Sequence, residues 1–271
     1  MQKSRANHFR PRVLATDLDG TLIPNEEEQK PSLETLRTKL SHTNSQLVFV
    51  TGRDFGLTTE AISENELPRA DWIICDVGTS VMHRVEDEPF ELVEDYRQHL
   101  KSLCADLPRE QLQQEFERWG ELRLQEESKQ GEFKLSFYTK ADEIDDLEQR
   151  IQQWLTEHSA PWSVICSVDP FTNDGLVDFL PKNVSKAYAL EWWRQHESWE
   201  QEEIVFAGDS GNDFAALTAG YLAVVVGNAH QSVINKVRQA MREREWLDRL
   251  HVAEGHSTTG VLEGCRAFGL F

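Results

Sequence analysis

The sequence contains little cysteine. Four of its 271 residues are cysteines, and no two of them are spaced as a Cys-x-x-Cys pair. Zinc sites and disulfide frameworks depend on such paired spacings, so neither is expected. Cys75 and Cys166 lie in apolar runs and are expected to be ordinary core residues. Free thiols fit a reducing compartment, which predicts a cytoplasmic location.

Long apolar runs are also missing. No stretch approaches the ~20 apolar residues that a membrane-spanning helix needs, so no membrane partner is expected. Residues 1–12 are polar and basic, and they lack the apolar segment of a secretory signal peptide. The sequence therefore predicts neither a membrane anchor nor a secretory leader.

Basic residues are scarce. Lys and Arg number 28 against 47 Asp and Glu, which gives a formal net charge of -19 at pH 7. Nucleic acids and anionic membranes are bound by clustered Lys and Arg, so neither is expected as a partner. The same charge opposes an anionic substrate unless a divalent cation and a few local bases reverse the field at the site.

The segments that are present alternate between strand and helix patterns. This rhythm runs through roughly the first 80 residues and resumes at 183, which predicts parallel βαβ units. Residues 86–160 are rich in Glu, Gln and Arg instead, which indicates an inserted α+β module. Strands are expected at 13–15, 46–50, 72–75, 132–139, 162–168, 176–180, 204–207 and 222–226, and helices at 31–41, 57–67, 92–107, 144–154, 183–196 and 214–219.

Two carboxylates follow the first expected strand. If the strand continued regularly, Asp17 and Asp19 would lie on one face. Two like charges this close are costly unless a cation or a proton relieves them. One could act as a nucleophile and the other as a general acid and base. Gly20 allows close approach of a ligand, and Thr21 offers a hydroxyl and an amide. The alternative is an ordinary turn rich in Asp and Gly.

Polar residues also follow two other expected strands. Thr51-Gly52-Arg53 could bind an anion or simply begin a helix. The run from Asp209 to Asp213 supplies oxygen ligands that suit Mg²⁺, and it lacks the glutamate of a calcium-binding EF-hand loop. Open α/β sheets place their sites at such strand ends.

Lys186 stands at an expected helix start, where a cation opposes the helix dipole. It is either a solvated surface lysine or a lysine that neutralises the acidic cluster.

These motifs together resemble those of the haloacid dehalogenase (HAD) superfamily. The resemblance covers essentially the whole chain, with a departure at Lys186-Ala187, where the family often has Lys-Gly. It implies an α/β fold: a Rossmann-like, parallel-sheet HAD core at 1–83 and 182–271, with an inserted α+β cap of type 2 at 84–181.

The resemblance also implies a mechanism. Asp17 would attack phosphorus and form an aspartyl-phosphate, and Asp19 would protonate the leaving alcohol and then activate water. Mg²⁺ would be held by Asp17, the backbone carbonyl of Asp19, and Asp209. Catalytic roles are thus expected for Asp17, Asp19, Thr51 and Lys186, substrate binding for Gly20, Thr21, Gly52, Arg53, Lys134 and Asn212, and a supporting role for Asp213, which would orient the lysine.

Three further segments, 133–138, 177–181 and 256–263, resemble bacterial sucrose-phosphate phosphatases. That resemblance implies sucrose 6-phosphate as substrate, with Lys134 on the sugar phosphate, although a lysine extending from a half-exposed strand is an equal reading. The loop 169–175 looks longer than in that group, and Asp54-Phe55 replaces an expected Ser-Tyr.

Several functional readings therefore stay open. The substrate could instead be mannosylfructose-phosphate, glucosylglycerate-phosphate or mannosylglycerate-phosphate. A sugar phosphomutase of the same fold, which needs a bisphosphate activator, and a non-catalytic phospho-acceptor are further alternatives. The glycosyltransferase that makes the sugar phosphate is the macromolecular partner expected for a phosphatase.

Overall fold

The computed structural model describes residues 10–86, 88–169 and 172–271, which form two units. One unit comprises the chain up to Gly78, Met82–Glu91 and Lys186–Phe271; the other comprises Thr79–Val81 and Leu92–Ser185. Each is described by itself below, as a core and a cap. The boundaries expected at 83/84 and 181/182 stay a prediction.

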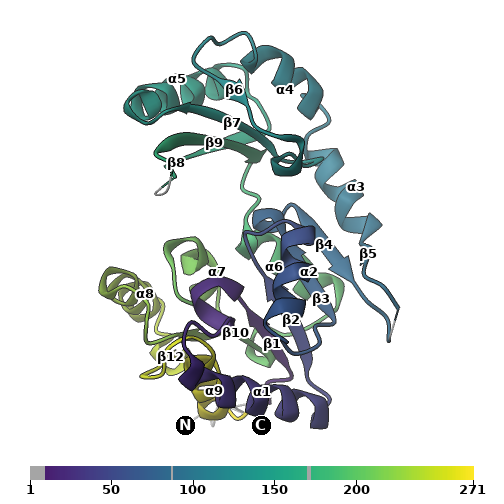
Figure 1. The fold of residues 1–271 in the computed structure, drawn as a ribbon, viewed down its shortest axis with the longest axis vertical. Coiled ribbons are helices and arrows are strands. Elements are labelled where there is room, and N and C mark those ends of the chain that lie inside the picture. Colours follow the sequence, from purple (N-terminus) through teal and green to yellow (C-terminus); the bar gives the residue numbers. More distant parts are fainter. Residues whose placement is uncertain (1–9, 87, 170–171) are drawn as a thin grey trace, which may run out of the picture. The chain divides into compact units, whose positions relative to one another are not determined.

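The core is built on an eight-stranded sheet in the order β12-β11-β10-β1-β2-β3-β4-β5 (Figure 1). All neighbours from β12 to β3 are parallel. The buried strand β1 (Val13–Thr16) lies between β10 (Ile204–Gly208) and β2 (Gln46–Val50), and chain order runs outward from it in both directions. Ligands bind at such switch points in open sheets. The other strands are β3 (Trp72–Cys75), β4 (Ser80–His83), β5 (Glu91–Leu92), β11 (Leu222–Val225) and β12 (Leu250–Val252).

Helices cover the core sheet through apolar stripes. In α1 (Lys30–His42), Leu33, Leu36 and Leu40 recur at helical spacing and join α9 (Ser257–Ala267) in one buried cluster with the sheet. The remaining core helices are α2 (Phe55–Glu64), α6 (Lys186–His196), α7 (Phe214–Leu217) and α8 (Gln231–Glu243). Their loops leave the carboxyl ends of the parallel strands free to carry polar side chains.

The cap contains a separate antiparallel sheet in the order β6-β7-β9-β8. Its alternating residues form an apolar face, where Phe137 and Phe179 pack with Phe116 in one cluster. The opposite face carries Ser136 and Asp178. The strands are β6 (Arg123–Leu124), β7 (Leu135–Lys140), β8 (Trp162–Val168) and β9 (Asp174–Pro181), and the helices are α3 (Glu94–Leu103), α4 (Arg109–Phe116) and α5 (Ile144–Glu157).

The fold class predicted from the sequence is confirmed: a mostly parallel core sheet and a separate antiparallel cap sheet. Two expected elements in the cap were wrong in extent. The helix expected at 92–107 is α3 alone, and a second helix, α4, follows Pro108, which cannot donate a backbone hydrogen bond. The strand expected at 132–139 begins only at Leu135, because the preceding residues form a tight turn.

Of the loop 169–175, Pro170 and Phe171 lie outside the described residues, and the expected extra length of this loop stays a prediction. Within the described part of the chain, none of the helices is both long enough and apolar enough to span a bilayer.

Candidate active site

The site begins where β1 ends. Asp17 is 4% exposed, and its backbone N–H donates to the carbonyl of Ala207 in β10 at 3.0 Å. The chain then makes a tight turn over Leu18–Leu22, in which Gly20 adopts a left-handed φ of 74°. The strand therefore does not continue through Asp19, and the regular alternation considered for the two aspartates does not occur. Asp17 is buried, whereas Asp19 is exposed.

Asp19 is held by Arg53. The guanidinium donates from Nε to Asp19 Oδ2 at 2.8 Å and from Nη2 to Asp19 Oδ1 at 2.6 Å, a two-pronged ion pair. This hydrogen bonding, foremost, raises the pKa of Arg53. Both carboxylate oxygens of Asp19 are thus occupied, so the pair has to open or turn before Asp19 can give a proton to a leaving group.

Lys186 lies under the acidic cluster. It is 2% exposed, and its ammonium donates to Asp17 Oδ1 at 2.7 Å and to Asp213 Oδ1 at 2.8 Å. A buried ammonium is tolerated only when it is paired in this way. Lys186, the first residue of α6, therefore points inward, and its ammonium links the carboxylates that follow β1 and β10.

The loop after β10 organises the remaining carboxylates. The side chain of Asp213 is fully buried, and its Oδ2 accepts from the N–H groups of Asp209 and Ser210 and from the hydroxyl of Ser210. Asp209 Oδ1 accepts from the hydroxyl of Thr21 at 3.1 Å. Both oxygens of Asp213 are therefore used in fixing the loop and the lysine.

The carboxylates of Asp17, Asp209 and Asp213 offer oxygens that all lie within 4.8 Å of one another, a group that could hold a metal ion. Among the described residues, no side chain donates a hydrogen bond to Asp17 Oδ2 or to Asp209 Oδ2; the further hydrogen bonds to these two carboxylates come from the backbone. Three carboxylates and one ammonium leave two negative charges, which a divalent cation would balance. Carboxylate oxygens are the ligands that Mg²⁺ prefers, so the residues fit that ion.

The pKa values also indicate that the site has too little positive charge to balance its carboxylates. Burial, followed by the charge of Asp213, raises the pKa of Asp17 to about 7. The same two causes raise the pKa of Asp209. Burial lowers the pKa of Lys186, but the charges of Asp17 and Asp213 outweigh burial and raise it overall. A further cation beside these carboxylates would be stabilising.

The second motif lies at the end of β2. Thr51 is fully buried, and its Oγ1 accepts from the N–H of Arg53 at 3.2 Å. Asp76 and Val77 after β3 adopt left-handed φ angles of 50° and 59°, held by bonds to the carbonyls of Arg53 and Thr51. Val rarely adopts this conformation, and such strain concentrates at functional sites. Backbone strain of this kind cannot be read from a sequence.

The other predicted residues lie as follows. Gly20, Thr21 and Gly52 lie in the loops just described, whereas Asn212 is exposed and accepts from the Ser210 hydroxyl at 2.6 Å. Lys134 belongs to the cap and is half-buried in the turn before β7, rather than on the strand as expected. Thus the structure brings together, within the core, the ends of β1, β2 and β10 with the start of α6, whereas Lys134 belongs to the other unit.

Two residues of the site were not predicted. Asn228, after β11, donates from Nδ2 to the carbonyl of Gly20 at 2.7 Å, and Ser257 at the start of α9 lies beside it. A polar residue after a fourth parallel strand was the available signal for Asn228. Ser257 falls in the segment 256–263, whose resemblance was noticed without a role being given to any of its residues.

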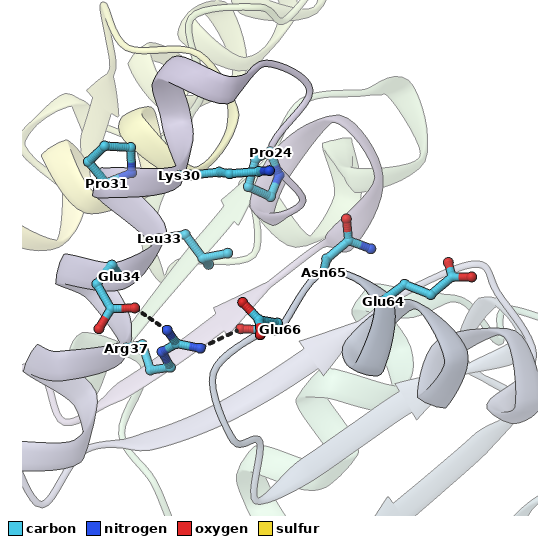
Figure 2. Close-up of a pocket in the computed structure, with 9 residues that line it drawn as sticks. All are labelled: Pro24, Lys30, Pro31, Leu33, Glu34, Arg37, Glu64, Asn65 and Glu66. Atoms are coloured by element: carbon cyan, nitrogen blue, oxygen red, sulfur yellow. Dashed lines mark hydrogen bonds and ion pairs between the residues drawn. The ribbon is translucent and has the colours of Figure 1, made fainter.

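A cavity of about 470 Å³ lies elsewhere in the core and contains none of the predicted site residues (Figure 2). Arg37 on its wall is bonded to Glu34 and to the carbonyl of Glu66, as Figure 2 shows. Lys30 is paired with Glu27. With its cations already paired, this cavity offers less to an anionic substrate than the strand ends do.

The fold and the acidic strand ends define a HAD-type phosphohydrolase. Residues 10–269 match the family model described as sucrose-6F-phosphate phosphohydrolase. The chain belongs to this sucrose-phosphatase family of HAD-like hydrolases, and it is a sugar-phosphate phosphatase of that family. The resemblance seen in the sequence is confirmed.

Similar proteins and a solved structure agree with this family assignment. A putative HAD-like hydrolase of Nitrosococcus oceani is 32% identical over 266 residues, covering 94% of this chain and 71% of that protein. A mannosylfructose-phosphate phosphatase of Agrobacterium fabrum is 26% identical over 260 residues, covering 96% and 97%. The structure of the Synechocystis sucrose-phosphatase, determined with sucrose and phosphate, matches with a TM-score of 0.73 at 23% identity, covering 96% and 98%. At that identity the structural match shows the fold.

Proposed function

We propose that this protein is a Mg²⁺-dependent phosphatase that hydrolyses sucrose 6-phosphate to sucrose and phosphate. The observation that carries the proposal is the buried Asp17 carboxylate, which has one oxygen fixed by Lys186 and the other, to which no side chain donates, near Asp209. A carboxylate fixed in this way is oriented to attack an electrophile. The family model supports sucrose 6-phosphate as the ester.

The first half-reaction transfers the phosphoryl group to the protein. The Asp17 carboxylate forms a bond to phosphorus while the bond from phosphorus to the sugar oxygen breaks. Asp19, once released by Arg53 and protonated from solvent, gives that proton to the sugar oxygen, and sucrose leaves. The ammonium of Lys186 and the hydroxyl of Thr51 stabilise the negative charge of the phosphoryl oxygens.

The second half-reaction returns the protein to its starting state. Asp19, now a carboxylate, takes a proton from water, whose oxygen attacks phosphorus. The bond between phosphorus and Asp17 breaks, and inorganic phosphate leaves. Asp213 keeps Lys186 oriented throughout by its hydrogen bond. When bound by Asp17, Asp209 and the carbonyl of Asp19, Mg²⁺ would supply charge neutralisation for the phosphoryl oxygens.

The fructose-containing phosphate of the Agrobacterium relative is the second candidate substrate, because that protein is matched over nearly its whole length. A screen of phosphate release separates the two: sucrose 6-phosphate, mannosylfructose-phosphate, and the glucosylglycerate and mannosylglycerate phosphates, each with Mg²⁺ and without a bisphosphate activator. The highest kcat/KM for sucrose 6-phosphate is expected. Activity only with added bisphosphate would indicate a phosphomutase instead. The glycosyltransferase that forms the preferred ester remains the proposed protein partner.

A further inference from the structure

The carbonyl of Gly20 is bonded from two sides by residues distant in the sequence. Asn228 Nδ2 donates to it at 2.7 Å, and the hydroxyl of Ser257 lies at 3.4 Å. The two partners are bonded to each other, because the N–H of Ser257 donates to Asn228 Oδ1 at 2.7 Å. These three bonds form a closed set, called here the Asn228–Ser257 clamp.

Ser257 is held in an unusual conformation within the clamp. It is fully buried and has a φ of 45°, in the left-handed region that residues other than glycine seldom adopt. Its hydroxyl also accepts from Asn25 Nδ2 at 3.0 Å. Such a conformation persists only where the surrounding bonds fix it, and here those bonds converge on the turn after β1.

That turn connects the proposed acid to a proposed metal ligand. Gly20 follows Asp19 and precedes Thr21, whose hydroxyl donates to Asp209 Oδ1 at 3.1 Å. The contact is close, because a Cβ on Gly20 would lie 2.5 Å from Asp209 Oδ2. A shift of the Gly20 peptide would therefore disturb the Oδ2 atom of Asp209 and the position of Asp19 together.

We infer that Asn228 and Ser257 are positioning residues: the clamp fixes the Gly20 peptide and thereby sets the distance between Asp19 and the Asp209 carboxylate. The inference rests on the proposed function, since the groups that it positions are those proposed to act. Asn228 is exposed, so removing its side chain takes little buried area from the fold. Its effect belongs to the geometry of the site rather than to the stability of the core.

The test compares Asn228→Ala with Asn235→Ala. Asn235 is an exposed asparagine on α8, and its side chain accepts only from Gln231 on the same helix among the described residues. For each variant, kcat and KM are measured with p-nitrophenyl phosphate, and the Mg²⁺ concentration that gives half of the Mg²⁺-dependent rise in Tm is measured without substrate.

Asn228→Ala is expected to lower kcat by about 10- to 100-fold, the usual cost of a misplacement near 1 Å, with KM little changed. It should also raise the Mg²⁺ midpoint several-fold, while its Tm without Mg²⁺ stays near that of Asn235→Ala. A merely structural residue would lower Tm and leave the Mg²⁺ midpoint unchanged. In Ser257→Gly, glycine tolerates the left-handed φ and keeps the N–H bond to Asn228, but the hydroxyl is lost. This variant should show a smaller change in kcat and Mg²⁺ midpoint in the same direction, and it provides the test if Asn228→Ala does not fold.

A kcat and a Mg²⁺ midpoint within twofold of Asn235→Ala would overturn the inference. If the wild-type protein releases phosphate from no ester, the proposed function fails, yet the Mg²⁺ midpoint still decides the role of the clamp.

Discussion

Asp17 and Lys186 show how one buried ion pair can leave a site reactive. The ammonium satisfies one oxygen of Asp17 and one of Asp213, and the other oxygen of Asp213 accepts from the loop after β10. Asp17 therefore keeps one oxygen to which no side chain donates, while its orientation is fixed. Arg53 plays a comparable part for Asp19, but at an exposed position, where the pair can open at little cost.

Replacing the nucleophile should remove catalysis without unfolding the protein. Asp17→Asn keeps the shape of the side chain but makes it a poor nucleophile, so phosphate release should fall by about 10³-fold or more. The raised pKa of Asp17 means that its charge is costly in the metal-free fold, so the Tm of the variant at pH 8 without Mg²⁺ should not fall. The matched control is the exposed Asp142→Asn; wild-type-like activity in Asp17→Asn would contradict the assignment.

Protons and Mg²⁺ should compete for Asp17. Its pKa is about 7 in the fold against an ordinary 3.8, so its proton stabilises the fold, and this contribution is lost as the pH rises through that range. Mg²⁺ binds the ionised form, so the Mg²⁺ midpoint should rise about tenfold for each pH unit below about 7 and level off above it.

The measurement is the Mg²⁺-dependent rise in Tm at pH 6, 7 and 8. Asp17→Asn is the control, because it has no proton to release at that position and should keep only the weaker pH dependence that comes from Asp209. Phosphate release by the wild type should also stop in EDTA. Equal Mg²⁺ midpoints for the wild type at pH 6 and pH 8 would rule out this competition.

At the scale of elements, the parallel strands were predictable, and the turns between them were not. Strands such as 46–50 are apolar on both faces because helices cover them on both sides, so their composition alone marks them. Most predicted site residues follow such strands; the exceptions are Lys186, which begins α6, and Lys134, which precedes β7 in the cap. The conformation of Leu18–Leu22 depends instead on partners more than 180 residues away, such as Asp209 and Asn228, which no local pattern contains.

The C-terminal end of the chain also contains elements and contacts that could not be predicted from the sequence. Helices α8 and α9 and strand β12 were not predicted, although α9 completes the apolar cluster under the sheet. The role of Ser257 depends on a left-handed φ and on bonds to Gly20 and Asn228. Only tertiary packing fixes such an angle for a serine. The residues proposed to do the chemistry, and Asp213 that orients Lys186, could therefore be predicted from the sequence, whereas Asn228 and Ser257 could not.

The turn after β1 is expected to require glycine at position 20. In Gly20→Ala, alanine would have to adopt a left-handed φ of 74°, and its methyl group would lie 2.5 Å from Asp209 Oδ2. The variant should lose about 1–3 kcal/mol of unfolding free energy and most of its Mg²⁺ response. Gly211→Ala is the matched control, since a Cβ there has no heavy atom within 4 Å. Chemical denaturation and Mg²⁺ titration of both variants check this, and equal behaviour of the two would show that the turn tolerates a side chain.

At the scale of the molecule, the chain separates its tasks between two units. The core holds every predicted residue that would contact phosphate or metal, except Lys134, and Asp19, which would protonate the leaving oxygen, is its one residue assigned to the sugar. Two phosphatases of this kind could thus share a core and differ in their sugars. We therefore expect the cap to supply the discrimination, because substrates that differ only in the alcohol present the same phosphate to the core.

Lys134 in the cap is the residue to test for that discrimination. Its ammonium has no hydrogen bond or ion pair with any described residue, so it is available to a ligand. Loss of a charged hydrogen bond costs roughly 1.5–3 kcal/mol, so Lys134→Ala should lower kcat/KM for sucrose 6-phosphate by about 10- to 100-fold. Hydrolysis of p-nitrophenyl phosphate, which has no sugar, should change far less, and the exposed Lys129→Ala should change neither. An equal loss of kcat/KM on both esters would mean that Lys134 binds the phosphate or stabilises the fold. Other residues would then have to recognise the sugar.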